Sequence, residues 1–337
     1  MNKLFGMVGL AALAAGMAGA ASAAPLLLQH PSLSQTHVAF DFAGQIWTVG
    51  RDGGQAEAIV IGQGRNSRPL FSPDGRWIAY TGGYDGNTDV YVVPAAGGEP
   101  RRLTWHPGPD VAVGWTPDGQ HVLFRSGRAS PRDLDQLYSV PLGGGAATEL
   151  PLPSVDQASL SPDGARVAYT PFNQWQPAWK QYRGGQTSRI WLANLSDSSI
   201  VKIPRENSND RSPMWVGQTV YFLSDRDGPI TLYAYDVASG AVKRVVDNPR
   251  GFDISAASAG PGGIVYSQFG ALKNFDPASG QGRPVQVSIN AVLPQVRPLL
   301  APVKGEDIQH AAITASGKRV LIEAHGEIRS APAEKGD

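Results

Sequence analysis

The 337-residue chain contains no cysteine, which excludes disulfide bridges and thiolate metal sites. It also has no excess of either charge, because 29 lysine and arginine residues balance 29 aspartate and glutamate residues. Such a balance does not favour nucleic acid or an anionic membrane as a partner. Glycine and proline are abundant, with 40 and 27 copies, which is typical of a chain that turns every few residues.

The usual catalytic and metal-binding motifs are missing as well. There is no Gly-x-Ser-x-Gly nucleophile elbow and no His-Glu-x-x-His zinc motif. None of the six histidines stands at metal-ligand spacing from another. Residues 225–228 (Asp-Arg-Asp-Gly) lack the further oxygen ligands of a calcium loop and predict a β-turn instead. We therefore predict no catalytic residue, no metal site and no cofactor in this chain.

Residues 1–23 are typical of a secretory signal peptide. Lys3 supplies the positive start, an apolar stretch rich in alanine and glycine follows, and residues 21–23 (Ala-Ser-Ala) fit the small-x-small cleavage rule. A transmembrane anchor is the alternative, but alanine and glycine contribute little hydrophobicity and no charges follow the stretch. Without a cysteine near the cleavage point, a bacterial lipid anchor is excluded. The segment predicts an exported, periplasmic protein.

The chain after the signal peptide is a repeat. A short apolar strand that ends in an aromatic residue recurs six times, and the closing aromatics are 40, 44, 45, 53 and 44 residues apart. These closing aromatics are Phe40, Tyr80, Phe124, Tyr169, Phe222 and Tyr266. A period of roughly 40–45 residues with four short strands per period is typical of a β-propeller. The predicted fold is therefore all-β, a six-bladed propeller of four-stranded antiparallel blades.

The turns of the repeat support this prediction. Residues 72–75, 116–119 and 161–164 read Ser/Thr-Pro-Asp-Gly and fall between the first and second strands of three repeats. Proline fixes φ at the second turn position, and glycine accepts the positive φ that other residues resist. In the sixth repeat Lys273 replaces the usual aromatic of the third strand, which makes that blade degenerate.

The repeat also predicts the domain organisation. The first repeat has its own inner strand at residues 28–33, and the sixth its own outer strand at residues 284–289. We therefore expect residues 24–290 to close without strand exchange, by side-chain packing between the first and sixth blades. Residues 291–307 contain three prolines and predict a linker. Residues 308–337 predict three strands of an incomplete blade, the start of a second propeller, either poorly ordered or resting on the first.

An insertion in the fourth repeat is a candidate binding loop. Its candidate contact residues are Trp175, Trp179, Tyr182 and Arg183. Exposed aromatics with arginine are common anchors for a partner. The alternative is that the tryptophans cap the sheet edge and that Arg183 bonds backbone carbonyls.

Several of these stretches resemble known families. The Ser-Pro-Asp-Gly turns resemble the propeller repeats of the TolB family and of tricorn-like proteases. Residues 179–185 are similar to a tricorn-family stretch that reads Trp-Lys-basic-Tyr-Arg-Gly-Gly, although Gln181 replaces the basic residue. Residues 211–215 and 221–228 of the fifth repeat also resemble that family. In addition, the repeats begin directly after the signal peptide, without the α/β domain that precedes a TolB propeller. The resemblance covers about residues 28–337.

The resemblance implies a non-catalytic part of an exported serine peptidase of the S41 type. In that family a seven-bladed propeller, a PDZ-like domain and a catalytic core with a serine nucleophile follow the first propeller. It implies peptides or unfolded polypeptide and the downstream catalytic domains of the same polypeptide as partners, and a homo-oligomer when full length. The propeller would gate the passage of peptides.

Two alternatives stay open at this point. One is a stand-alone TolB-like propeller that binds envelope proteins, and the other is a propeller joined to an α/β-hydrolase of the prolyl-oligopeptidase type. If peptide passes through the central channel, Arg68 and Arg211 near the starts of inner strands are the best-placed charged contacts. They could equally form salt bridges between blades.

Overall fold

The computed structural model describes residues 26–62, 64–130, 134–172, 180, 182–248, 251–291 and 302–335. The chain divides into two compact units, Met1–Asn290 and Ala291–Asp337. The described residues form β-strands and loops, apart from the short 3-10 turn η2 (Gly305–Asp307). The predicted signal peptide, residues 1–23, lies outside the described residues, and so do residues 292–301 of the predicted linker.

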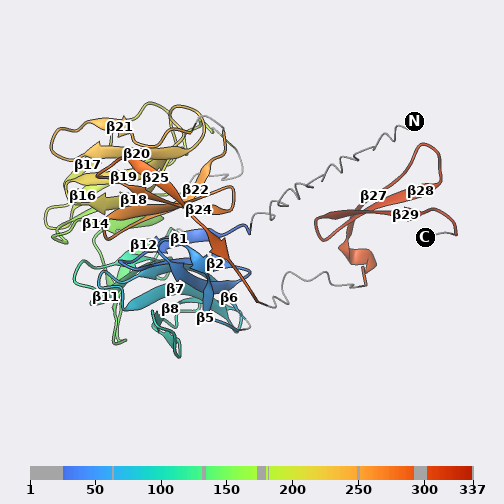
Figure 1. Ribbon diagram of the computed structural model, residues 1–337, viewed down its shortest axis with the longest axis horizontal. Coiled ribbons are helices and arrows are strands. Elements are labelled where there is room, and N and C mark those ends of the chain that lie inside the picture. Colours follow the sequence, from blue (N-terminus) through green and yellow to red (C-terminus); the bar gives the residue numbers. More distant parts are fainter. Residues whose placement is uncertain are drawn as a thin grey trace, which may run out of the picture. The chain divides into compact units, whose positions relative to one another are not determined.

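Six four-stranded antiparallel sheets follow one another along the first unit, and each uses strands of one consecutive segment (Figure 1). We number them sheets 1 to 6 in chain order. Sheet 1 contains β1 (Gln29–Leu33), β2 (His37–Phe42), β3 (Gln45–Gly50) and β5 (Glu57–Val60); sheet 2 contains β6 (Arg65–Phe71), β7 (Trp77–Tyr84), β8 (Asn87–Pro94) and β9 (Arg101–Arg102); sheet 3 contains β10 (Asp110–Trp115), β11 (His121–Ser126), β12 (Gln136–Pro141) and β13 (Thr148–Glu149). Sheet 4 contains β14 (Gln157–Leu160), β15 (Arg166–Thr170), β16 (Trp191–Asn194) and β17 (Ile200–Lys202); sheet 5 contains β18 (Asp210–Val216), β19 (Thr219–Ser224), β20 (Thr231–Asp236) and β21 (Val242–Arg244); sheet 6 contains β22 (Ile254–Gly260), β23 (Gly263–Gln268), β24 (Ala271–Asp276) and β25 (Gln281–Val285). The predicted all-β fold of four-stranded antiparallel sheets is confirmed.

The closing aromatics of the repeat form the core of the sheets. All six are buried, five of them with no exposed surface and Tyr266 with 4%. Phe124 stacks on Tyr138 of the next strand at 5.5 Å between ring centroids, and Phe222 stacks on Tyr233 at 5.9 Å. Such pairs contribute about 0.5–1.5 kcal/mol beyond the burial of their area. One aromatic at the fourth position of each second strand therefore contributes to the core of its sheet.

The turns adopt the geometry that their sequence predicts. In the turn at residues 72–75, the Ser72 hydroxyl donates to the Asp74 carboxylate at 2.6 Å, and the Gly75 amide donates to the Ser72 carbonyl at 2.8 Å. The hydrogen bond from Ser72 lowers the pKa of Asp74 to about 2. Gly75 has φ of +71°, which a residue with a Cβ adopts at a cost. These aspartates thus build turns.

Sheets 1 and 6 contact one another, although they lie at opposite ends of the first unit in sequence (Figure 1). Backbone hydrogen bonds join the two regions: the Leu28 amide donates to the Gly270 carbonyl at 3.0 Å, and the Gly54 amide donates to the Gln286 carbonyl at 2.8 Å. The short strands β4 (Gly54–Gln55) and β26 (Val287–Ser288) form a two-residue parallel ladder. The seam therefore contains backbone pairing.

Two details differ from the sequence prediction. The outer strand of sheet 6 is β25, residues 281–285, and not residues 284–289, because the turn after Asp276 ends at Gly280, whose amide donates to the Asp276 carbonyl. Residues 287–288 then leave sheet 6 to pair with β4. Each four-stranded sheet contains strands of one segment of the chain, and the contact of sheets 1 and 6 is not side-chain packing alone.

The second unit contains one three-stranded antiparallel sheet, formed by β27 (Ile308–Ile313), β28 (Arg319–Ala324) and β29 (Glu327–Pro332). These strands match the three predicted from the repeat. Most side chains of this sheet are exposed, including Ile313 at 65% and Ile328 at 74%.

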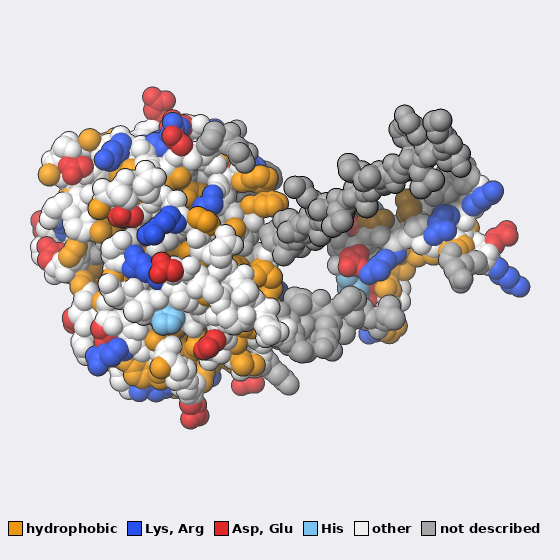
Figure 2. Space-filling view, in the orientation of Figure 1, with side chains coloured by type: hydrophobic (Ala, Val, Ile, Leu, Met, Phe, Trp, Pro, Cys, Tyr) orange, Lys and Arg blue, Asp and Glu red, His pale blue; other side chains and the backbone are white. Residues whose placement is uncertain are grey.

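The two signs of charge are mixed over the surface of the first unit. Figure 2 shows lysine and arginine side chains interspersed with aspartate and glutamate on the visible face. This distribution agrees with the balanced composition of the chain.

Candidate functional site

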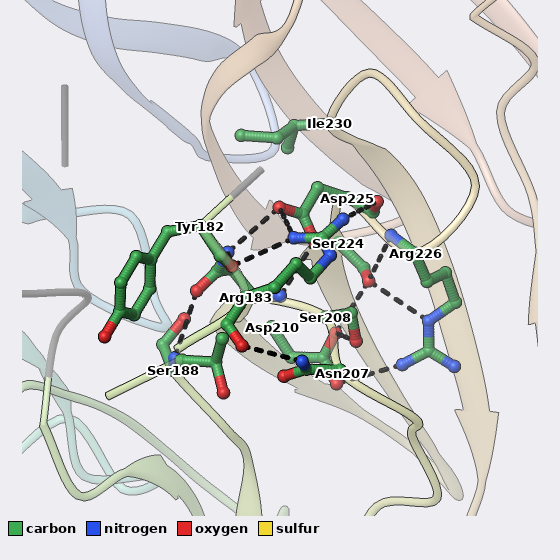
Figure 3. Close-up of polar contacts among 12 residues, drawn as sticks. Tyr182, Arg183, Ser188, Asn207, Ser208, Asp210, Ser224, Asp225, Arg226 and Ile230 are labelled. Carbon is green, nitrogen blue, oxygen red and sulfur yellow. Dashed lines mark hydrogen bonds and ion pairs between the residues drawn. The ribbon is translucent and has the colours of Figure 1, made fainter. Parts of the chain in front are cut away.

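The described end of the fourth-repeat insertion is attached to sheet 5 (Figure 3). The Arg183 guanidinium donates to the Asp225 carboxylate at 2.8 Å and to the Asp225 carbonyl at 3.1 Å. Asn207 donates to the Arg183 carbonyl at 2.7 Å, and Asn209 donates to the Tyr182 carbonyl at 3.0 Å. Residues 182–183 are therefore held on sheet 5 through both side chain and backbone.

Asp225 is the centre of this attachment. Its side chain is 4% exposed, and its carboxylate accepts hydrogen bonds from Arg183, from the Asn209 amide at 2.8 Å and from the Asn209 side chain at 3.0 Å. Farther along, Lys180 forms an ion pair with Asp253 at 3.0 Å. A buried carboxylate with several donors fixes the insertion at its C-terminal end.

The candidate contact residues of the insertion thus fall into two groups. Trp175 and Trp179 lie outside the described residues. Tyr182 is half-buried, and Arg183 is exposed over part of its surface but pairs with Asp225. Arg183 also bonds two backbone carbonyls, those of Asp225 and Tyr182, as the structural alternative expected.

A second arginine beside this attachment, Arg226, makes a set of contacts that Arg128 repeats in sheet 3. In sheet 5, Arg226 forms an ion pair with Asp210 at 2.9 Å, donates to the Ser224 hydroxyl at 3.1 Å, and lies over Phe222 and Tyr233. In sheet 3 the same contacts are made by Arg128 with Asp110, Ser126, Phe124 and Tyr138. The sequence signal is Ser-x-Arg, in which the serine is the last residue of the second strand and the arginine follows it. Its recurrence indicates a structural role for Arg226.

A cavity of about 690 Å³ lies next to the attachment. Its lining residues are Arg183, Pro204, Arg205, Glu206, Asn207, Ser208, Arg226, Asp227, Gly240 and Val242. The segment between β17 and β18 supplies five consecutive members of this lining. The cavity therefore has three guanidinium groups and two carboxylates on its wall.

Arg205 differs from the other two arginines of the cavity. It donates to the Ser208 carbonyl and to the Thr187 hydroxyl, the latter at 3.1 Å, and it forms no ion pair with any described residue. Burial lowers the pKa of Arg205, and the charges of Arg189 and Arg226 lower it further, whereas Asp210 and Asp225 raise it. Arg205 is thus a partly buried cation with neutral partners.

The structure places Arg68 and Arg211 within β6 and β18, the first strands of sheets 2 and 5. Arg68 has φ of +55°, and the register of sheet 2 shifts at this point. Its amide donates to the Asp41 carboxylate at 3.2 Å, and that carboxylate also contacts His30 at 2.8 Å. Burial lowers the pKa of Arg68, and the charge of Arg125 lowers it further, whereas the charges of Asp156 and Asp41 raise it.

Arg211 has one buried guanidinium nitrogen without a partner. Its Nε is buried without a hydrogen-bond partner, and its Nη2 donates to the Ile254 carbonyl at 3.4 Å. Burial lowers the pKa of Arg211, against the charges of Asp253 and Asp225. Among the described residues, neither Arg68 nor Arg211 has a carboxylate within ion-pair distance, but nearby carboxylates still act on the charge of both arginines.

The described residues contain no group of three or more histidine, cysteine, aspartate or glutamate side chains that could hold a metal ion. Across the same parts of the chain, no helix has the length and apolar character needed to cross a membrane.

Successive four-stranded antiparallel sheets with buried strand aromatics define a β-propeller protein. Residues 25–281 match the Tricorn protease N-terminal beta propeller domain, and the chain belongs to this family. The resemblance to tricorn-like proteases drawn from the repeats is thereby confirmed.

Three comparisons give the extent of the similarity. Tricorn protease homolog 1 of Streptomyces coelicolor is 32% identical over 261 residues, which cover 77% of this chain and 24% of that protein. The crystal structure of the tricorn protease aligns with a TM-score of 0.71 at 22% identity, covering 91% of this chain and 30% of that chain. A TolB structure from Agrobacterium tumefaciens gives a TM-score of 0.54 at 23% identity, covering 65% of this chain and 80% of that chain. The chain thus spans about a quarter of the length of the curated relative.

Proposed function

We propose that the chain is the non-catalytic N-terminal propeller portion of an exported tricorn-like serine peptidase. The family match over residues 25–281 carries this proposal. The aligned region accounts for only 24% of the Streptomyces relative, which leaves room for further domains. In this proposal the propeller is a scaffold and gate for peptides that pass to or from a downstream catalytic core of the S41 type.

The proposal treats sheets 1 to 6 as the six blades of one closed ring. The contact between β1 and β22, the Leu28–Gly270 hydrogen bond and the ladder of β4 with β26 support closure between the first and last blades. A ring of this kind surrounds a central channel, and inner strands line it.

Three further parts of the proposal rest on the sequence and the family. Residues 1–23 would direct the protein to the periplasm. The full-length protein would form a homo-oligomer, with its own downstream catalytic domains as partners. Residues 308–337 would start a second propeller, because β27, β28 and β29 repeat the pattern of the first three strands of a blade.

Arg68 and Arg211 are the channel residues that this proposal assigns to peptide contact. Both are half-buried cations on inner strands without an ion pair among the described residues, and the buried Nε of Arg211 has no partner. A guanidinium in this state can donate hydrogen bonds to the carbonyls of an extended peptide.

The peptide-contact assignment predicts a loss of binding when these arginines are replaced. In Arg68→Gln and Arg211→Gln, we expect the affinity for an end-blocked 12-residue peptide without acidic side chains to fall about tenfold, the effect of one charge-assisted hydrogen bond. Fluorescence anisotropy of a labelled peptide measures this change. Arg76→Gln is the matched control, because Arg76 lies in an exposed turn. Unchanged affinity in both variants would contradict passage through the channel.

A stand-alone TolB-like scaffold is the second candidate. The Agrobacterium TolB structure favours it, since this chain covers 80% of that protein. The two candidates differ in whether the native polypeptide carries a reactive serine.

A further inference from the structure

We propose that the cavity beside sheet 5 binds an oxyanion, a carboxylate or a phosphate, through the guanidinium of Arg205. This site is separate from the channel arginines Arg68 and Arg211, and it does not depend on the passage of peptides.

The three arginines of the cavity do not have equal freedom to bind a ligand. Arg183 is neutralised by Asp225, and Arg226 by Asp210, a carboxylate that is wholly buried. Two more donors of Arg226 bond the Ser224 hydroxyl and the Pro204 carbonyl, so three of its five donors have partners in the protein. The positive charges of these two arginines are therefore already committed to the protein itself.

Arg205 has no carboxylate partner among the described residues, and most of its donors are unused. Two of its N–H groups bond the Ser208 carbonyl and the Thr187 hydroxyl, so three of the five donors of a guanidinium remain. Ser208 and Thr187 are each only 2% exposed, so Arg205 is anchored to buried groups. A fixed guanidinium with unused donors on a cavity wall is prepared for the bidentate binding of a carboxylate or phosphate.

The acidic residues of the cavity limit the affinity without removing the site. Asp227 accepts a hydrogen bond from the Tyr233 hydroxyl at 2.6 Å and lies 4.0 Å from Arg244, so its charge is partly compensated. Glu206 is exposed and forms no ion pair with the described residues. Its charge next to Arg205 would weaken the binding of an anion, which gives the proposal a second, oppositely signed test.

Binding to the purified protein by isothermal titration calorimetry tests the proposal with two probes. Inorganic phosphate is the first, and the end-blocked peptide acetyl-Gly-Glu-Glu-Gly-amide is the second, with its glutamine counterpart as the uncharged match. We expect at least one anionic probe to bind, the glutamine peptide not to bind, and Arg205→Gln to weaken binding about tenfold. The probe that binds more tightly identifies the source of the oxyanion.

Three further variants keep the test decisive. Glu206→Gln should strengthen binding about two- to fivefold at low salt, because it removes a like charge from the same wall. Arg76→Gln and Glu99→Gln are the matched controls at exposed positions outside the cavity, and both should bind as the parent protein does. The Glu206→Gln result stands even if Arg205→Gln fails to fold. The proposal is overturned if neither anionic probe binds, if Glu206→Gln does not strengthen binding, or if a folded Arg205→Gln variant binds undiminished.

Discussion

Alanine at Asp210 is expected to lower the free energy of unfolding by about 3–5 kcal/mol, the cost of removing one partner of a buried ion pair. The Asp210 side chain has no exposed surface and accepts hydrogen bonds from Ser208, Ser224 and Arg226. Its removal leaves the guanidinium of Arg226, 18% exposed, without a counter-charge against the rings of Phe222 and Tyr233. Chemical denaturation followed by tryptophan fluorescence measures the change.

The equivalent ion pair in sheet 3, between Arg128 and Asp110, provides an internal comparison. Asp110→Ala removes the equivalent partner of Arg128 and should also destabilise the protein by several kcal/mol. The effect should be smaller than at Asp210, because Asp110 Oδ1 already has no hydrogen-bond partner. Asp52→Ala, at an exposed position, is the control and should change stability by less than about 0.5 kcal/mol. If Asp210→Ala lowers the free energy of unfolding no more than Asp52→Ala does, the ion pair of Asp210 with Arg226 does not stabilise the fold.

Gly260→Ala is expected to have a comparably large effect, a loss of about 3 kcal/mol from overpacking. Gly260 lies at the end of β22, where a Cβ would stand 2.1 Å from the Leu33 carbonyl oxygen and 2.8 Å from the Leu33 Cβ. The nearest obstacle is backbone of sheet 1, which cannot move aside like a flexible side chain. The substitution therefore separates sheets 1 and 6 or strains both.

The control for this substitution is Gly143→Ala, because a Cβ at Gly143 meets no atom within 4 Å. Hydrogen exchange adds a spatial readout: protection should fall first at the β4–β26 ladder and at the Leu28 amide in Gly260→Ala. If the melting temperatures of the two variants agree, the close packing of sheets 1 and 6 is not required for stability.

The repeating parts of this fold could be predicted because their signals are local. A buried aromatic stands at the fourth position of each second strand, and in three repeats a Ser/Thr-Pro-Asp-Gly turn precedes that strand, as in the bond of Ser72 with Asp74. Strand periodicity and turn chemistry both act over a few residues, so one sequence suffices to recognise them. The three strands of residues 308–332 were recognised by the same pattern.

The contacts between sheets 1 and 6 could not be predicted from the same signals. The ladder of β4 with β26 has only two residues in each strand, and Gly54, with φ of +128°, shows no strand pattern. Its partner lies more than 230 residues away in the chain, as in the hydrogen bond of Ser288 with Gly54. Pairing of this kind is set by the tertiary fold and not by propensity.

The candidate site, too, could be predicted from the sequence only in part. The sequence marked Arg183 as a residue of interest but not its buried partner Asp225, because residues 225–228 were interpreted only as a turn. That turn exists, with the Gly228 amide donating to the Asp225 carbonyl at 3.2 Å, and the same aspartate also holds the insertion. Arg205 carries no motif, and its lack of an ion pair becomes visible only when its neighbours are placed.

The most direct test of the central claim is the intact mass of the native product in the periplasmic fraction of the producing cell. An antibody against the first unit would identify the product, and a serine-reactive probe would label a catalytic serine. The account predicts a labelled polypeptide several times larger than the 35.7 kDa of this chain. An unlabelled product near the mass of this chain without residues 1–23 would contradict it and favour a free-standing propeller.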